Sequence, residues 1–157
     1  MKIDVTNLQD VIRIKLPAVR RAARAALEDM LGCYSIVFVD DEQMREVNRK
    51  YLHRDNTTDV IAFPFQDAPL TTDDCAGEII VSAELAAAEA KSRDIDVDAE
   101  LALYVIHGSL HLAGFDDSTP AQAAEMHRRE KDILTELGYD AERLWKPLKP
   151  GRSQVRS

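Results

Sequence analysis

Residues 101–117 read LALYVIHGSLHLAGFDD and decide how the rest of the chain is interpreted. Residues 101–113 are apolar on nearly every side, which is typical of a helix buried at the centre of a domain. His107 and His111 lie four residues apart on this helix, so their imidazoles project from one face, about one turn apart. Gly114 permits the left-handed backbone that ends such a helix and reverses the chain.

Two imidazoles at this spacing can bind one metal ion. After the glycine turn, Asp116 or Asp117 can fold back and add a carboxylate to the same ion. Two histidines and one carboxylate leave a fourth position open to water, which indicates a catalytic zinc site and not a structural one. The metal would lower the pKa of that water towards about 7. Gly108, inside the helix, is expected to leave space beside the ion.

The alternative is a pair of hydrogen-bonded core histidines. Burying two imidazoles without partners would cost on the order of a few kcal/mol, and a metal ion would remove that cost. The glycine turn and the two acids that follow the histidines also favour a metal. The zincin protease motif H-E-x-x-H has a glutamate after its first histidine, where this chain has Gly108. A peptidase is therefore disfavoured, although an acid from elsewhere in the chain could replace that glutamate.

The remaining sequence alternates between strand and helix patterns. Strand-like segments are residues 3–7, 34–39, 60–65 and 78–81, and residues 66–76 are expected to form a loop. Helices are expected from Pro17 to Leu31 with Gly32 as the stop, after Asp40 or Asp41, after Ser82, after Asp96 or Asp98, and from Pro120 to Leu137. The pattern predicts an α/β (α+β) fold, a small mixed four-stranded sheet packed by about five helices, with a metal cleft at the central buried helix.

Length and composition indicate one globular domain. The chain has 157 residues, of which 45% are hydrophobic and 31% charged, and its net charge is −8. No apolar run has the length of a membrane span, and the N-terminus lacks the apolar region of a secretory signal. We therefore expect a cytoplasmic protein without a membrane partner. Cys33 and Cys75 lack the spacing of a zinc knuckle or redox pair, and a disulfide between them is disfavoured in a reducing compartment.

Charge changes sign near the C-terminus. After Glu142 every charged residue is basic, so we expect a metal-dependent hydrolase domain over residues 1–142 and a basic, flexible tail over residues 143–157. Such a tail is usually only solvated, and the functional alternative is a weak anchor for a polyanion. Trp145 in the tail could stack on a base, but packing against the domain is favoured. The acidity of residues 1–142 predicts weak, salt-sensitive binding of free RNA.

Three motifs in the same order resemble the YbeY family of metal-dependent endoribonucleases. His107–Asp116 matches H-G-x-L-H-L-x-G-[YF]-D, NRKYLHRDNTTDVIAFPF (48–65) resembles N-x-x-Y-R-x-K-D-x-P-T-D-V-L-S-F-P, and GEIIVS (77–82) resembles G-D-I-V-I-S. The resemblance implies a single-strand-specific endoribonuclease that uses one zinc ion, with other divalent transition metals as alternatives. Metal-bound water would attack the phosphodiester.

The resemblance also implies a biological role. The enzyme would act in ribosomal RNA maturation, at the 3′ end of the small-subunit rRNA, and in ribosome quality control. Its partners would be ribosomal RNA and the small ribosomal subunit, not DNA. The alternatives are a ribosome-assembly binding factor with a structural metal, and a metal hydrolase of another substrate such as a peptide.

The chain departs from the family pattern at the third metal ligand. The family usually has a third histidine ten residues after the first, where this chain has Asp117. We assign the ligand role to Asp117, because aspartate binds zinc at about 2.0–2.2 Å. His127 is the competing third ligand. Asp116 is expected to orient one of the histidines through its other ring nitrogen.

A second departure concerns RNA binding. Leu52 stands where the family often has an arginine that helps handle RNA. Arg54 is our candidate substrate contact, because a guanidinium can bind phosphate with two parallel hydrogen bonds. The alternative is a surface salt bridge between Arg54 and Asp55 or another nearby acid. Asp59 is expected to cap or brace the loop before the next strand.

Overall fold

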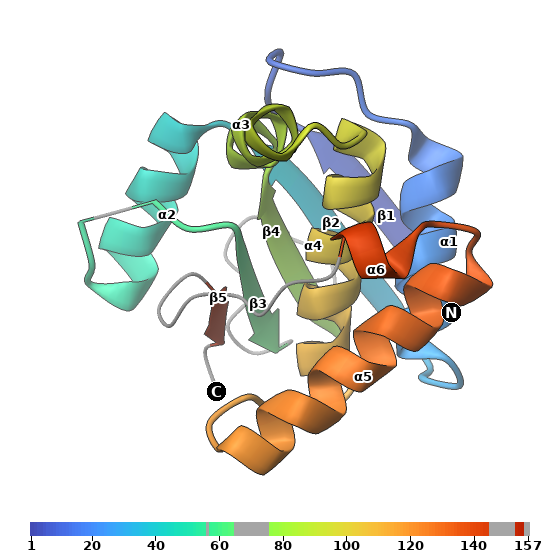
Figure 1. The fold of residues 1–157 in the computed structure, drawn as a ribbon. Helices are drawn as coiled ribbons and strands as arrows, with labels where there is room; N and C mark the ends of the chain where they lie inside the picture. Colours follow the sequence, from blue (N-terminus) through green and yellow to red (C-terminus); the bar gives the residue numbers. More distant parts are fainter. Residues whose placement is uncertain (56, 65–75, 145–152, 156–157) are drawn as a thin grey trace.

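The computed structural model describes residues 1–55, 57–64, 76–144 and 153–155. Its strands form one mixed sheet in the order β1-β2-β4-β3-β5 (Figure 1). The strands are β1 (Lys2–Asn7), β2 (Cys33–Val39), β3 (Val60–Pro64), β4 (Gly77–Ser82) and β5 (Ser153–Val155). Strands β1, β2 and β4 run parallel to one another, β3 is antiparallel to β4, and β5 is parallel to β3. The mixed sheet of four predicted strands is confirmed, with β5 as a short addition.

Helices cover both faces of this sheet. They are α1 (Leu16–Leu27), α2 (Asp41–Leu52), α3 (Ala83–Arg93), α4 (Val97–Leu112), α5 (Pro120–Glu136) and the single turn α6 (Ala141–Leu144). Helix α4 lies on one face with α1, α3 and α5 packed around it, and α2 lies on the opposite face (Figure 1). None of the helices in the described ranges combines the length and apolarity that a membrane span needs.

The two faces of the sheet have separate cores. In β2, Ile36 and Phe38 pack into the core that contains α4, whereas Val37 and Val39 pack into the core that contains α2. This alternation follows from the two-residue period of a strand. The whole segment 99–111 of α4 is buried, as its continuous apolar pattern predicts. The predicted site therefore lies on the most enclosed helix of the fold.

Predicted helix starts are confirmed where a capping side chain is present. The carboxylate of Asp40 accepts from the backbone N–H of the third residue of α2, and Ser82 caps α3 in the same way. Asp96 accepts from the backbone N–H of the second residue of α4. Pro120 is the first residue of α5. Gly114 follows α4 with φ +105°, the left-handed conformation that the sequence predicts.

The predicted end of the first helix is wrong. Helix α1 ends at Leu27, where Glu28 takes a positive φ of 49°, and Leu31 is 84% exposed. The carbonyl of Gly32 instead accepts from the backbone N–H of Lys2 at 2.9 Å, in line with the pairing of β1 and β2. Pairing of the strands thus draws residues 28–32 away from the helix, which an apolar period alone does not reveal.

Some predictions fall outside the described residues. These include Cys75, Trp145, most of the basic tail, and the loop 66–76 apart from Ala76. The division between domain and tail after residue 142 falls within α6 and stays a prediction.

Gly108 serves helix–sheet packing, and the expectation that it leaves space beside an ion is wrong. A Cβ at this position would lie 2.7 Å from Cγ2 of Ile79 and 2.8 Å from Cγ2 of Val60. Both side chains belong to the sheet, so the absence of a side chain lets α4 lie directly against β3 and β4. This contact fixes the height of the histidine-bearing turns above the sheet.

We expect Gly108→Ala to destabilise the protein. Helix propensity alone would favour alanine by about 1 kcal/mol, whereas overpacking of a filled core costs about 1–3 kcal/mol. The expected net change is a loss of roughly 1–2 kcal/mol in the free energy of unfolding, measured by urea denaturation. Ser109→Ala is the matched control, because the Ser109 hydroxyl is buried without a hydrogen-bond partner among the described residues. A Gly108→Ala protein as stable as the native one would contradict this packing.

Candidate metal centre

The last turns of α4 bring the two histidines together. The Nε2 atoms of His107 and His111 lie 3.2 Å apart, and the two rings are nearly perpendicular, at 84°. His107 is fully buried and His111 is 9% exposed. The predicted convergence of two imidazoles from adjacent turns is therefore present in the structure.

Asp117 completes a triangle of ligand atoms. Its Oδ2 lies 3.9 Å from Nε2 of His107 and 3.9 Å from Nε2 of His111. Around a tetrahedral zinc ion, ligand atoms bonded at about 2.0–2.2 Å lie roughly 3.3–3.6 Å from one another, so small adjustments would bring all three atoms to one ion. In the described part of the chain, these three residues form a cluster with the donor set of a metal site.

The other ring nitrogens have fixed partners. Nδ1 of His107 lies 2.8 Å from Oε1 of Glu130, a fully buried carboxylate on α5, and Nδ1 of His111 lies 3.2 Å from the carbonyl oxygen of Phe115. Each Nδ1 must donate, because its partner can only accept. In the neutral rings, both Nε2 atoms then carry lone pairs and face each other. Two acceptors 3.2 Å apart need a proton or a cation between them, which fits a metal site.

The surroundings of the two rings shift their pKa values in opposite directions. Burial by itself lowers the pKa of His107, but its hydrogen bond to Glu130 and the charges of Glu130, Asp59 and Asp117 outweigh burial and raise the pKa above its usual value. Burial and the charge of His107 lower the pKa of His111. Without a metal, a proton taken up by the pair therefore favours His107 over His111. A metal must displace this proton, so metal affinity falls as the pH is lowered.

The role predicted for Asp116 is wrong. Its carboxylate accepts from the backbone N–H of Asp117 at 2.8 Å and from the hydroxyl of Ser118 at 2.7 Å, and these hydrogen bonds lower its pKa. Asp116 thus shapes the loop that carries Asp117. Glu130 and the Phe115 carbonyl orient the rings instead.

Glu130 is the functional residue that the sequence interpretation missed. It lies 23 residues after His107 and on another helix. One signal was available: Met126, Glu130 and Ile133 follow the i, i+4, i+7 spacing of one helix face, and the two apolar members are fully buried. An acid within an apolar stripe needs a partner, and His107 is that partner.

The other predicted residues lie outside the triangle. His127 lies on α5 and is not part of the cluster. Arg54 follows α2, and Asp55 pairs at 3.1 Å with Arg49. Asp59 is fully buried and its Oδ1 accepts from the next backbone N–H at 2.8 Å, as the predicted bracing role requires.

We expect Glu130→Gln to weaken metal binding by about 10–100-fold, because a carboxylate that holds a ligating histidine fixes its tautomer and raises its basicity. Metal affinity can be measured by competition with a coloured chelator. Glu125→Gln, an exposed position on the same helix, is the matched control and should bind metal as the native chain does. Equal affinities for the native protein and Glu130→Gln would contradict the role of Glu130.

Comparison with known proteins shows similarity over most of the chain. A family model described as Endoribonuclease YbeY matches residues 2–138. The proteins named endoribonuclease YbeY from Syntrophus aciditrophicus and Hydrogenovibrio crunogenus are 32% and 33% identical to it, over 88% and 85% of this chain and 92% and 91% of their own lengths. The fold is similar to the solution structure of TM1509 from Thermotoga maritima, with a TM-score of 0.62, 24% identity, and coverage of 95% of this chain and 98% of that one.

Proposed function

Because this chain belongs to the YbeY endoribonuclease family, we propose that it hydrolyses phosphodiester bonds of single-stranded RNA at a metal site formed by His107, His111 and Asp117. The observation that carries the proposal is the triangle of two Nε2 atoms and one carboxylate oxygen. Both histidines are buried, whereas the Asp117 side chain is 37% exposed. Water and substrate can therefore approach from the Asp117 side.

We propose zinc as the metal, since two imidazoles and one carboxylate suit it, with other divalent transition metals as alternatives. When bound, the ion supplies Lewis acidity, which lowers the pKa of water and offsets negative charge on a phosphate. The residues of the chain hold it in place. Glu130 and the Phe115 carbonyl orient the two rings, and Asp117 adds a negative charge that reduces the Lewis acidity of the site relative to three histidines.

We propose Arg54 as a contact to a substrate phosphate. It follows the C-terminal end of α2, after His53, which has a positive φ of 57°. The last turn of α2 also carries Arg49 and Lys50, so this end of the helix is basic and can attract a polyanion. The guanidinium of Arg54 suits a phosphate there, because it can donate two parallel hydrogen bonds to it.

The finer biological role is proposed from the family. We propose ribosomal RNA as the substrate, maturation of the 3′ end of the small-subunit rRNA and ribosome quality control as the processes, and the small ribosomal subunit as the partner. A cytoplasmic location is part of the same proposal. The relatives support the endoribonuclease activity through their names, and the ribosomal role rests on the resemblance of the motifs.

The structure gives less support to the two other functions. A zincin-type peptidase needs a general base where Gly108 packs against the sheet. A purely structural metal would normally have four protein ligands, whereas the cluster in the described residues has three, one of them exposed.

A substrate panel tests the proposed activity. The zinc-loaded protein is expected to cleave a fluorescent single-stranded RNA and to leave both the same sequence in DNA and a peptide panel intact. Removal of the metal with a chelator should stop cleavage, and zinc should restore it. Hydrolysis of peptides together with intact RNA would overturn the proposal.

A further inference from the structure

Basic residues are also concentrated near the start of the sequence. Between Asp10 and Glu28 the sequence contains only basic charged residues, although the net charge of the chain is −8. They are Arg13, Lys15, Arg20, Arg21 and Arg24. This segment comprises the loop before α1 and nearly all of α1. The metal centre does not include any of these residues.

Most of these cations lack an acidic partner in the described part of the chain. Lys15 pairs with Asp98 of α4 at 2.8 Å, but within the described residues no carboxylate lies at salt-bridge distance from Arg13, Arg21 or Arg24. Most arginines elsewhere in the described chain pair with carboxylates, namely Arg49, Arg93, Arg128, Arg129 and Arg143. Like charges without such partners repel one another, and an anionic ligand would relieve that repulsion.

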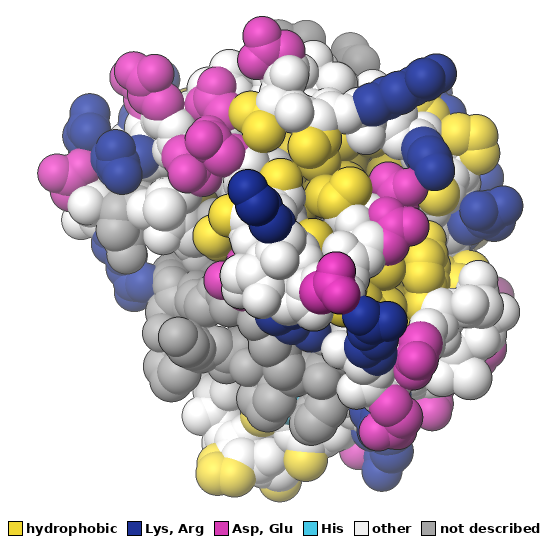
Figure 2. Space-filling model, turned by 45° about the horizontal axis from the view of Figure 1, so that its top comes forward, with side chains coloured by type: hydrophobic (Ala, Val, Ile, Leu, Met, Phe, Trp, Pro, Cys, Tyr) yellow, Lys and Arg dark blue, Asp and Glu magenta, His cyan; other side chains and the backbone are white. Residues whose placement is uncertain are grey.

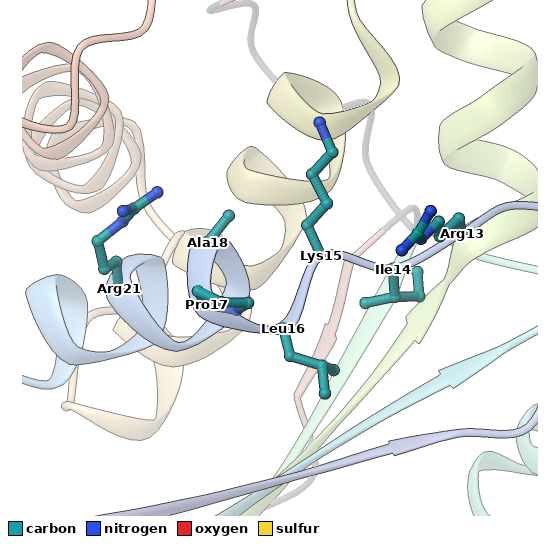
Figure 3. Close-up of a pocket in the computed structure, with 7 residues that line it drawn as sticks. All are labelled: Arg13, Ile14, Lys15, Leu16, Pro17, Ala18 and Arg21. Atoms are coloured by element: carbon teal, nitrogen blue, oxygen red, sulfur yellow. The ribbon is translucent and has the colours of Figure 1, made fainter.

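A cavity of about 660 Å³ lies among these cations. Its cationic lining residues are Arg13, Lys15 and Arg21, and its apolar ones are Ile14, Leu16, Pro17 and Ala18. Figure 3 shows Arg13 at one end of this turn, Arg21 at the other and Lys15 between them. The volume falls within the range of about 300–1,000 Å³ that is typical of ligand sites. Apolar walls beside these arginines suit a nucleotide, which has both a base and a phosphate.

An aromatic side chain borders the same surface. A second, smaller hollow shares Lys15 and Ala18 with the cavity and is also lined by Asp98, the partner of Lys15, and by Tyr139, which packs partly against the core. On the side of the molecule where α1 lies, Figure 2 shows Lys and Arg side chains around an area of hydrophobic side chains, with a few Asp and Glu side chains among them. Cations combined with an aromatic ring are typical of surfaces that bind single-stranded nucleic acid through phosphate contacts and base stacking.

We propose that this surface, defined by Arg13, Arg21 and Tyr139, is a second RNA-binding site that contacts phosphates and a base. It is remote from the metal centre, because the Lys15–Asp98 pair marks the first turn of α4 and the histidines lie on its last turns, roughly 14–20 Å further along the helix. It would hold a distant part of the RNA whose cleavage site lies at the metal. The proposal rests on the proposed function only in taking RNA as the substrate.

The test measures RNA binding in a His111→Ala background, so that hydrolysis does not interfere. Binding of a labelled single-stranded RNA is followed by fluorescence anisotropy over a range of salt concentrations. Arg13→Gln combined with Arg21→Gln should weaken binding roughly tenfold or more and reduce the salt slope by about 0.7 for each phosphate that the variant no longer neutralises. The control with the same charge change is Lys2→Gln combined with Arg128→Gln, two exposed basic residues that pair with carboxylates.

Three outcomes would overturn the proposal. The first is an unchanged affinity in the Arg13/Arg21 double variant, and the second is an equal weakening in the control, which would indicate net charge alone. The third is competition by poly-glutamate as strong as that by RNA of equal charge, which would indicate an acidic protein as the ligand. The binding assay uses a variant that is not expected to cleave RNA, so it gives a result whether or not the native chain hydrolyses RNA. Absence of hydrolysis by the native chain would therefore count only against the proposed function.

Discussion

His111→Ala is expected to abolish metal-dependent RNA cleavage and to leave the fold intact. The substitution removes one of two imidazole ligands, and with it the Lewis acidity that a bound ion supplies. That contribution amounts to several kcal/mol of transition-state stabilisation, so kcat/KM should fall by roughly a thousandfold or more. The His111 side chain is buried, so its truncation should lower the free energy of unfolding, but its hydrogen-bonding contacts are with the nearby His107 and Phe115, so the sheet and the helices around it should still form.

Cleavage of a fluorescent RNA and thermal unfolding are measured on the same preparations. His127→Ala is the matched control, since it removes a histidine from α5 that lies outside the cluster and should leave cleavage unchanged. If His111→Ala still cleaves RNA, the metal centre is not required for cleavage. Unfolding of the variant on loss of metal would favour a structural ion.

Asp117→Ala is expected to reduce metal affinity more than about 100-fold, because loss of a direct ligand should exceed the 10–100-fold effect of losing an outer partner. The carboxylate is the exposed corner of the triangle and lies on a loop, so its removal leaves the rest of the core in place. Metal content after dialysis and affinity by chelator competition both report this change. Unchanged stoichiometric binding by the variant would show that Asp117 is not the third ligand.

Asp117→His provides the matched positive control. It places the third histidine that is usual in the family at this position, and a neutral imidazole leaves more positive charge on the ion. We therefore expect Asp117→His to bind metal and to cleave RNA at least as fast as the native chain. Rescue by histidine but not by alanine would separate a ligand role from a loop-shaping role, which Asp116 already performs through its hydrogen bonds to Asp117 and Ser118.

The core of the site could be predicted from the sequence because its geometry is local. The i, i+4 spacing of His107 and His111 and the turn at Gly114 fix where the ligands lie, once the helix is recognised from its apolar residues. The caps at Asp40, Ser82 and Asp96 follow from equally local chemistry.

The features that the sequence did not predict depend on contacts between segments that are distant in the sequence. The Glu130–His107 hydrogen bond joins α5 to α4, and the role of Gly108 depends on how closely the sheet approaches it. The end of α1 depends on the pairing of β1 with β2. The periodicity of one segment does not indicate its contacts with another segment. The order of the strands in the sheet also depends on contacts of this kind.

The central claim is that two imidazoles and one carboxylate bind a single ion and leave one position for water. Anomalous diffraction from crystals of the metal-loaded protein tests it most directly. The predicted result is one strong peak bonded to Nε2 of His107, Nε2 of His111 and a carboxylate oxygen of Asp117, with no fourth protein ligand. A peak bound by other residues, or no peak between the two histidines at saturating metal, would contradict it.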